Sequence, residues 1–306
     1  MLPIAMLTGA SIYLIYHILP QTLHSVGPVL NDMLGVIQPM LIFLMLFLTF
    51  CTLEPKDLRF HRWHWWLLLI QGGMFALLGI CAVILLHVLP DRSNLSVLIE
   101  CAMLCFVCPT ATAAAVVTRK LGGDVPGITT YIVLVNILTA FLVPIVIPLV
   151  KPEGAMGFWT SFVMIVGKVF PLLLTPCLAA WAVRYLFPKL HRRLLSYPDL
   201  AFYLWSVALT LAIAVTTKSI VHTSMSLGLI LLMALVSLVC CAFQFCVGRR
   251  IGDVTAGQSL GQKNTVFAIW LAYTFMTPET AIVGGLYSIW HNIYNSWQLR
   301  RSLRKR

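Results

Sequence analysis

Long runs of apolar residues, separated by short polar segments, recur along the whole chain. A helix needs about 20 apolar residues to cross the hydrocarbon core of a bilayer. Ten segments of roughly that length are predicted to be transmembrane helices: 2–19, 29–52, 64–89, 95–118, 126–150, 157–187, 199–217, 225–248, 254–276 and 279–299. The predicted fold class is therefore an all-α membrane protein with ten spanning helices.

Two of these segments are interrupted by polar residues, glycine and proline, at similar places in the two halves of the chain. The interruptions are residues 108–113 in the fourth segment and 258–265 in the ninth. Backbone that leaves the helix at membrane depth must be satisfied by protein or by a water-filled cavity. Matched interruptions are typical of secondary transporters, in which discontinuous helices cross near the midplane. We expect half-helices to begin near Thr110 and Gln262, with free N–H groups and a positive dipole end that favour an anion.

Ten helices divide into two groups of five, over residues 1–150 and 151–306, and an odd number per half inserts the second half upside down. The two halves are therefore predicted to be inverted repeats. Sixteen of the 21 Lys and Arg residues follow the even-numbered predicted helices or lie in the C-terminal tail. The positive-inside rule predicts that this side of the membrane, with both termini, faces the cytoplasm. The predicted location is the cell membrane, which in bacteria is the inner membrane. The net charge of +11 is thus a topology signal, and no nucleic-acid partner is expected.

Composition excludes a soluble protein, because 60% of the residues are hydrophobic, 10% are charged and the mean hydropathy is +0.92. The nine cysteines all fall in apolar segments without histidine at metal-binding spacing, so no metal or other cofactor is expected. A membrane enzyme or a receptor-like sensor needs a catalytic constellation or a soluble effector domain, and neither is recognisable in the sequence. The partners expected are therefore the lipid bilayer and a small-molecule substrate, with no obligate protein partner.

Three stretches resemble the bile acid:sodium symporter superfamily. Residues 44–49 with 54–59 resemble its second helix and the exit from it, 108–118 followed by 123–125 its broken fourth helix, and 289–293 its last helix. The resemblance implies a core domain of helices 3–5 and 8–10 and a panel domain of helices 1, 2, 6 and 7. It also implies transport of organic anions such as bile acids, keto acids or pantoate-like acids by alternating access.

Several residues depart from the sodium-coupled pattern of that superfamily. At the first sodium site, the resemblance aligns Ala114 and Ala115 with a serine and an asparagine, and Ile128 and Ile132 with hydroxylated residues. Sodium needs several oxygen ligands, and methyl groups supply none. On the ninth helix, Ser259 takes the place of a sodium-bridging glutamate and Lys263 that of a glutamine, unless Gln262 is the true match. Neither sodium site is then expected to form.

The lysine suggests how the charge of the site is kept. A glutamate with two sodium ions carries one net positive charge, and so does a serine with a protonated Lys263. We therefore predict a secondary active or facilitative carrier of a small organic anion that does not require sodium. A buried lysine can also bind and release a proton, so proton coupling stays open. The alternative within the same class is a sodium-coupled organic anion symporter.

The predicted site residues are the polar groups near the two interruptions. The substrate-binding residues are predicted to be Thr110, Thr112, Lys263, Asn264, Gln71 and Asn136, and the ion-coupling residues Lys263, Gln262 and Ser259. Buried threonines often bond the carbonyl four residues earlier, and polar amides can simply join helices. Lys168 is expected either to snorkel or to face the space between panel and core. Glu100 and Asp32 are expected near an interface, in contact with water.

Overall fold

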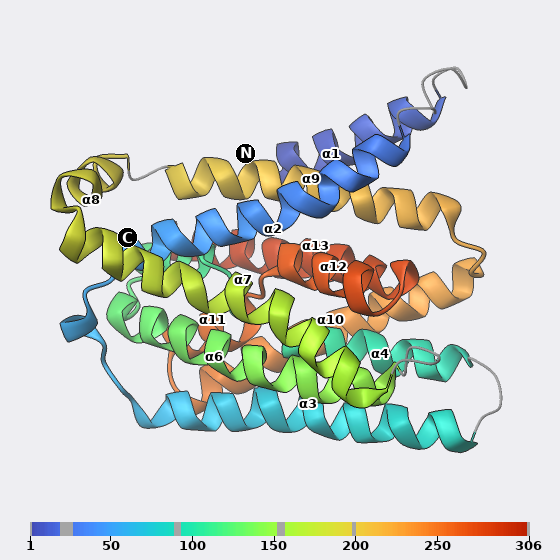
Figure 1. Cartoon of the computed structure of the whole chain (residues 1–306). Coiled ribbons are helices and arrows are strands. Elements are labelled where there is room, and N and C mark those ends of the chain that lie inside the picture. The colour runs from blue at the N-terminus through green and yellow to red at the C-terminus, as the bar shows by residue number, and fades with distance from the viewer. Residues whose placement is uncertain (1, 19–26, 89–92, 152–156, 198–199, 305–306) are drawn as a thin grey trace.

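The computed structural model describes residues 2–18, 27–88, 93–151, 157–197 and 200–304, and within these ranges the chain is helical (Figure 1). The helices are α1 (Leu2–Ile18), α2 (Gly27–Cys51), α3 (Arg62–Val88), α4 (Asn94–Val107), α5 (Ala113–Lys120), α6 (Val125–Val150), α7 (Phe158–Leu186), α8 (Pro188–Leu195), α9 (Leu200–His222), α10 (Leu227–Ile251), α11 (Val254–Gly261), α12 (Thr265–Phe275) and α13 (Pro278–Leu303), with a 3-10 turn η2 (Pro55–Asp57).

Within the described ranges, six helices are long and apolar enough to cross a membrane, namely α2, α3, α6, α7, α9 and α10. Shorter apolar helices lie at Ile4–Ile18, Asn94–Val107 and Thr265–Phe275. A helical, multi-pass membrane protein is therefore confirmed. The last helix, α13, is less apolar because one of its faces carries a buried polar row: Thr280, Ser288, His291, Asn292, Asn295 and Gln298. A polar row of this kind belongs inside the protein, away from lipid.

The predicted interruptions are real, and each divides its segment into two helices. The fourth segment becomes α4 and α5, and the ninth becomes α11 and α12. Pro109 explains the first break, because proline donates no N–H and holds the preceding residue, Cys108, in an extended conformation. Lys263, which the sequence interpretation placed within a helix, lies instead in the three-residue break between α11 and α12.

The short helix α8 was missed by the sequence interpretation, which treated 188–198 as a loop. Its high content of basic residues hid an amphipathic pattern, and Pro188 stands at its first turn, where proline is well tolerated. Its one buried side chain, His191, places Nε2 2.8 Å from the carbonyl oxygen of Cys51 at the end of α2. α8 is therefore anchored against α2 while its basic side chains face outward.

We keep the names of the two predicted domains for two sets of helices, whose arrangement can be followed in Figure 1. We call α1, α2, α7 and α9 the panel, in which α1 packs along α9 and α2 packs against both α7 and α9. We call α3–α6 and α10–α13 the core, in which α3 contacts α4 and α6 while α10 contacts α4, α11 and α13. The two breaks therefore both lie within the core. α6 and α7, which are consecutive in the chain, also pack together and connect the two groups.

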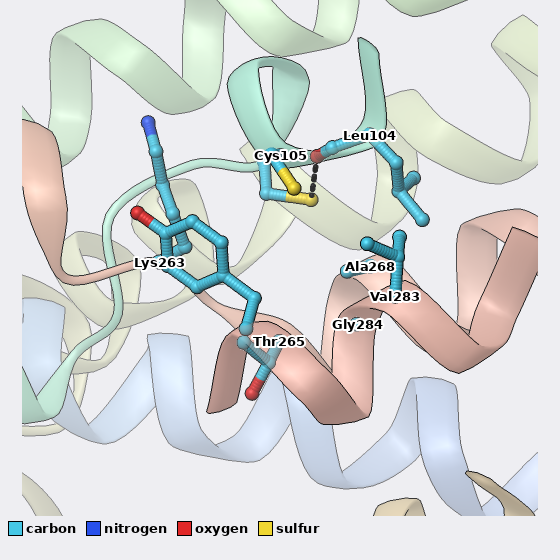
Figure 2. A pocket seen from close by; sticks show the side chains of 9 residues that line it. Leu104, Cys105, Lys263, Thr265, Ala268, Val283 and Gly284 are labelled. Carbon is cyan, nitrogen blue, oxygen red and sulfur yellow. Dashed lines mark hydrogen bonds between the residues drawn. The ribbon is translucent and has the colours of Figure 1, made fainter. Parts of the chain in front are cut away.

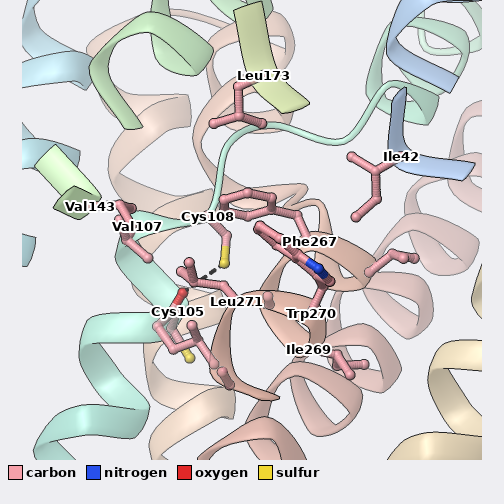
Figure 3. Packing of buried hydrophobic residues seen from close by; sticks show 14 of the residues in the cluster. Ile42, Cys105, Val107, Cys108, Val143, Leu173, Phe267, Ile269, Trp270 and Leu271 are labelled. Carbon is pink, nitrogen blue, oxygen red and sulfur yellow. Dashed lines mark hydrogen bonds between the residues drawn. The ribbon is translucent and has the colours of Figure 1, made fainter. Parts of the chain in front are cut away.

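Panel and core meet through an apolar layer beside the breaks (Figure 3). Phe267 and Trp270 of α12 belong to the same buried cluster as Ile42 of α2 and Leu173 of α7, and each of the four is at most 5% exposed. Large apolar side chains packed at this density leave little room for water. The panel is thus closed against the core on the side of the breaks where α12 lies.

Candidate functional site

The two breaks cross and hydrogen-bond to each other. The N–H of Ala111 donates to the carbonyl of Gln262 over 2.8 Å, and the N–H of Asn264 donates to the carbonyl of Pro109, also over 2.8 Å. Thr110 and Lys263 thus form a short antiparallel bridge between segments that are 153 residues apart in the chain. The crossing satisfies part of the backbone that each break exposes, as backbone at membrane depth requires.

This pairing corrects the expected half-helix starts. α5 begins at Ala113 and α12 at Thr265, three residues later than the predicted starts near Thr110 and Gln262. The N–H groups of Ala111 and Asn264, which we expected to be free for an anion, are already occupied by the crossing. The positive ends of α5 and α12 still point toward the breaks, so their dipoles add to a positive potential there.

The side chain of Lys263 lies deep inside the core. It is 1% exposed, and its Nζ donates to Oε1 of Gln71 on α3 over 2.7 Å. Figure 2 shows its tip turned away from Ala268 and Val283, on the far side of the break. The lysine therefore reaches from the crossing toward α3, within the core, and away from the panel.

Gln71 connects the lysine to the rest of the core. Its Oε1 also accepts a hydrogen bond from the hydroxyl of Tyr131 on α6 over 3.1 Å, and its Nε2 donates to the carbonyl of Cys108 over 3.0 Å. One buried amide thus fixes the ammonium, the first break and α6 together. This contact joins helices, as the alternative interpretation of Gln71 expected, and it also positions the charge of Lys263.

Lys263 has no acidic partner among the residues that the structure describes. The ion pairs in those residues involve Glu54, Glu100 and Asp124, and none of them includes Lys263. An ammonium buried without a counter-charge is costly inside a membrane protein. Such a position favours a negatively charged ligand nearby.

Some of the predicted polar side chains at the breaks make hydrogen bonds, and others have an atom without a hydrogen-bond partner. The Thr110 hydroxyl donates to the carbonyl of Ser259 over 2.5 Å, and the Asn264 side chain accepts from the N–H of Phe267, capping α12. In contrast, Oγ of Ser259 and Oε1 of Gln262 are buried and have no hydrogen-bond partner in the described residues. These two atoms can therefore bind a water molecule or a ligand.

Thr112 and Asn136 lie at the margins of this cluster. Thr112 is 8% exposed, and its side chain does not cap α5. Asn136 on α6 donates to the carbonyl of Ile132 in its own helix over 2.7 Å, while its Oδ1 has no partner in the described part of the chain. The geometry thus brings Thr110, Lys263, Gln71 and Ser259 into one bonded cluster, and leaves Thr112 and Asn136 outside it.

The positions that the family resemblance aligns with the first sodium site carry apolar side chains here. Ala114, Ile128 and Ile132 are each 0% exposed, so their methyl groups fill space inside the core. A sodium site formed from side chains needs oxygen atoms at such positions. The side chains here supply none.

Two groups that hold the crossing were not found from the sequence. The hydroxyl of Tyr287 on α13 donates to the carbonyl of Gly261 over 2.8 Å. Nε2 of Gln244 on α10 lies 3.2 Å from both the carbonyl of Cys105 and the Tyr287 hydroxyl. A glutamine in the middle of an apolar helix was a usable signal for Gln244, whereas an isolated tyrosine gives none.

A small cavity lies beside the crossing, between α4, α12 and α13 (Figure 2). Its lining residues are Leu104, Cys105, Cys108, Lys263, Thr265, Ala268, Val283, Gly284 and Tyr287. The space is close to that of one water molecule. It is too small for an organic anion.

The remaining charged residues of the membrane helices differ in their surroundings. Glu100 was expected to contact water, but it is 2% exposed and pairs with Nζ of Lys151 at 2.5 Å, with the Thr280 hydroxyl 3.2 Å away. That prediction is wrong, because partners from α13 and from the end of α6 cover the carboxylate. Lys168 is exposed on α7 with its Nζ 5.5 Å from the ring centre of Phe275, between panel and core. Asp32 is exposed, as expected.

Comparison with known proteins gives one family. Residues 39–225 match the family model described as Sodium Bile acid symporter family. The matched range begins within α2 and ends just before α10, so it includes the first break and covers more than half of the chain. No curated protein matches the chain.

Proposed function

Because the chain belongs to the sodium bile acid symporter family, we propose that it carries a small organic anion across the membrane by alternating access. Members of this family are membrane transporters and not enzymes, which agrees with the helical, lipid-facing architecture. The anion is a bile-acid-like molecule or another carboxylate. In this proposal ten membrane segments form two inverted repeats, 1–150 and 151–306, whose broken helices cross inside the core.

Lys263 is the observation that carries the proposal. Its ammonium is buried in the core, bonded to Gln71 at 2.7 Å and without an acidic partner in the described residues. The resemblance implies that sodium-coupled relatives place bound cations near the same break. We infer that the tethered ammonium supplies the positive charge in their place, and that transport is independent of sodium.

The anion is expected to bind on the panel side of the crossing. Lys263 points toward Gln71 on α3, within the core, so it acts on the anion through space, together with the positive ends of α5 and α12. Thr112 and Asn264 lie at the edge of the breaks, where their side chains can reach an anion once panel and core separate. Ser259 and Gln262, at the second break, keep buried oxygens without a hydrogen-bond partner in the described residues, and these can hold the water that a proton-coupled cycle needs.

The experiment that tests this proposal is ion replacement. Purified protein is reconstituted in liposomes, and uptake of radiolabelled taurocholate and of small carboxylates is measured in sodium chloride and in choline chloride. We expect uptake to differ by less than about twofold. A tenfold or greater loss of affinity in choline, about 1.4 kcal/mol, would refute sodium independence and establish the alternative, a sodium-coupled symporter. That alternative needs a test because the matching family is described as one of sodium symporters.

A further inference from the structure

A second, more open cavity lies at the opposite end of the core helices from the α12–α13 turn. Its volume is about 340 Å3. The lining residues are Leu121, Arg249, Val254, Trp297, Gln298, Arg301 and Ser302, which come from the end of α5, the end of α10, the start of α11 and the end of α13. None of them contributes to the crossing described above.

Two guanidinium groups dominate the charge of this cavity. Arg249 comes from α10 and Arg301 from α13, and neither takes part in an ion pair among the described residues. The nearest acid along the chain is Asp253, and its carboxylate is occupied in capping the N–H groups of Thr255 and Ala256. The C-terminal ends of α10 and α13 contribute about half a negative charge each, which leaves the cavity net positive.

The cavity also offers uncharged hydrogen-bond donors. Gln298 is 7% exposed, and its Oε1 accepts from Nε2 of Gln258 over 2.6 Å. Gln298 belongs to the cavity lining, and its own Nε2 makes no hydrogen bond within the described part of the chain. With the hydroxyl of Ser302, the site presents two guanidinium groups, an amide and a hydroxyl, and no carboxylate. Two arginines from different helices suit the tetrahedral oxygens of a phosphate group.

The remaining walls are apolar. Leu121 and Val254 line the cavity, and Trp297 is 50% exposed with the Arg301 guanidinium 5.4 Å from its ring centre. Tryptophan at the end of a membrane helix is typical of the headgroup region. The cavity thus places phosphate-binding donors beside an apolar wall, at the level where membrane helices end. A molecule that is both anionic and apolar matches these walls better than a soluble anion does.

We propose that this cavity binds the phosphodiester headgroup of an anionic phospholipid. The site lies on the side of the membrane that the distribution of Lys and Arg predicts to be cytoplasmic, where anionic lipids attract basic residues. The lining comes from α5, α10, α11 and α13, all of which are assigned to the core, so the headgroup would be held by the core. The proposal is independent of the transported substrate.

Lipid binding can be measured by native mass spectrometry of the full-length protein, titrated with phosphatidylglycerol or with phosphatidylcholine. We expect phosphatidylglycerol to bind the wild type at least tenfold more tightly than phosphatidylcholine does. In Arg249→Gln and in Arg301→Gln the affinity for phosphatidylglycerol should fall about tenfold, the effect of losing one charged hydrogen bond. The matched controls are Arg250→Gln and Arg300→Gln, which remove the same charge from the neighbouring position of the same helix, outside the cavity lining.

Three outcomes would overturn the proposal. Equal losses in the site variants and the controls would mean that only the general positive charge of this surface attracts lipid. Equal binding of phosphatidylcholine would mean that the apolar wall alone is recognised. A third arm adds inorganic phosphate and follows thermal stability: stabilisation that requires Arg249 and Arg301, without tight binding of phosphatidylglycerol, would identify a soluble phosphate as the ligand.

Discussion

Replacing Lys263 by methionine separates the contribution of this residue to binding from its contribution to stability. Methionine keeps an unbranched side chain of similar length and removes the charge. The anion then faces two helix dipoles without a full positive charge nearby. We expect its affinity to fall by about 1–3 kcal/mol, the Coulomb energy of two unit charges that interact through space without contact at an effective dielectric of about 20. This corresponds to a loss of about fivefold to 150-fold.

The effect on folding is expected to be small because two terms oppose each other. The variant loses a hydrogen bond from a charged donor to Gln71 at 2.7 Å, worth about 1.5–3 kcal/mol. It also loses the cost of burying an ammonium that has no acidic partner, which is several kcal/mol. Oε1 of Gln71 keeps its hydrogen bond from Tyr131 at 3.1 Å, so no buried acceptor is left unpaired. The free energy of unfolding should therefore change by less than about 2 kcal/mol.

The assay begins with a thermal-shift screen of bile acids, keto acids and pantoate-like acids against the wild type. The anion that stabilises the protein most is then titrated by calorimetry into wild type, Lys263→Met and Lys263→Arg. The arginine variant should recover only part of the affinity, because a planar guanidinium does not fit a space that holds a compact ammonium. If Lys263→Met inserts, folds, binds and transports like the wild type, the role of the lysine as a cation surrogate is refuted.

Three further predictions concern topology and packing. Arg193→Cys and Ser224→Cys are each made in a background that carries Cys246→Ser. Arg193→Cys should react with a membrane-impermeant maleimide only from the cytoplasm, and Ser224→Cys only from outside. The reverse pattern would invert the topology. Gly261→Ala should lower thermal stability by about 1–3 kcal/mol, since its Cβ would stand 2.4 Å from the buried ring of Phe245, and an unchanged Tm would contradict that packing. Glu100→Gln should cost about 2 kcal/mol by leaving the facing lysine unpaired, and the double variant that also removes this lysine should recover most of the loss.

The sequence was sufficient to predict the six long apolar helices, because each is a long apolar run bounded by polar residues. It also located both breaks, since proline at 109 and the polar residues around Lys263 interrupt otherwise apolar segments. The first residues of α5 and α12 could not be predicted with the same accuracy. Each start depends on which N–H groups are satisfied across the crossing, and that pairing joins segments distant in the chain.

Contacts between residues that are distant in sequence also explain why the surroundings of some side chains were predicted wrongly. Glu100 is covered by Lys151 and Thr280, which are 51 and 180 residues away from it, so nothing local distinguishes it from a solvated interfacial glutamate. The contact of Lys263 with Gln71 likewise spans 192 residues. The sequence identified both members of that pair as buried polar groups, but it gave no means to know that the lysine turns away from the panel.

The covalent attachment of Lys263 has a consequence for the energetics of the proposed transport cycle. A coupling ion crosses the membrane with the substrate and is released, whereas in a cycle without proton coupling Lys263 stays protonated and its charge returns with the empty carrier. Each monoanion that is transported therefore moves one net negative charge through the membrane, and transport is electrogenic. That movement is worth about 2.3 kcal/mol per 100 mV. In a cell whose interior is negative, the membrane potential drives the anion outward, and uptake proceeds only against that potential, down a steeper gradient of the anion itself.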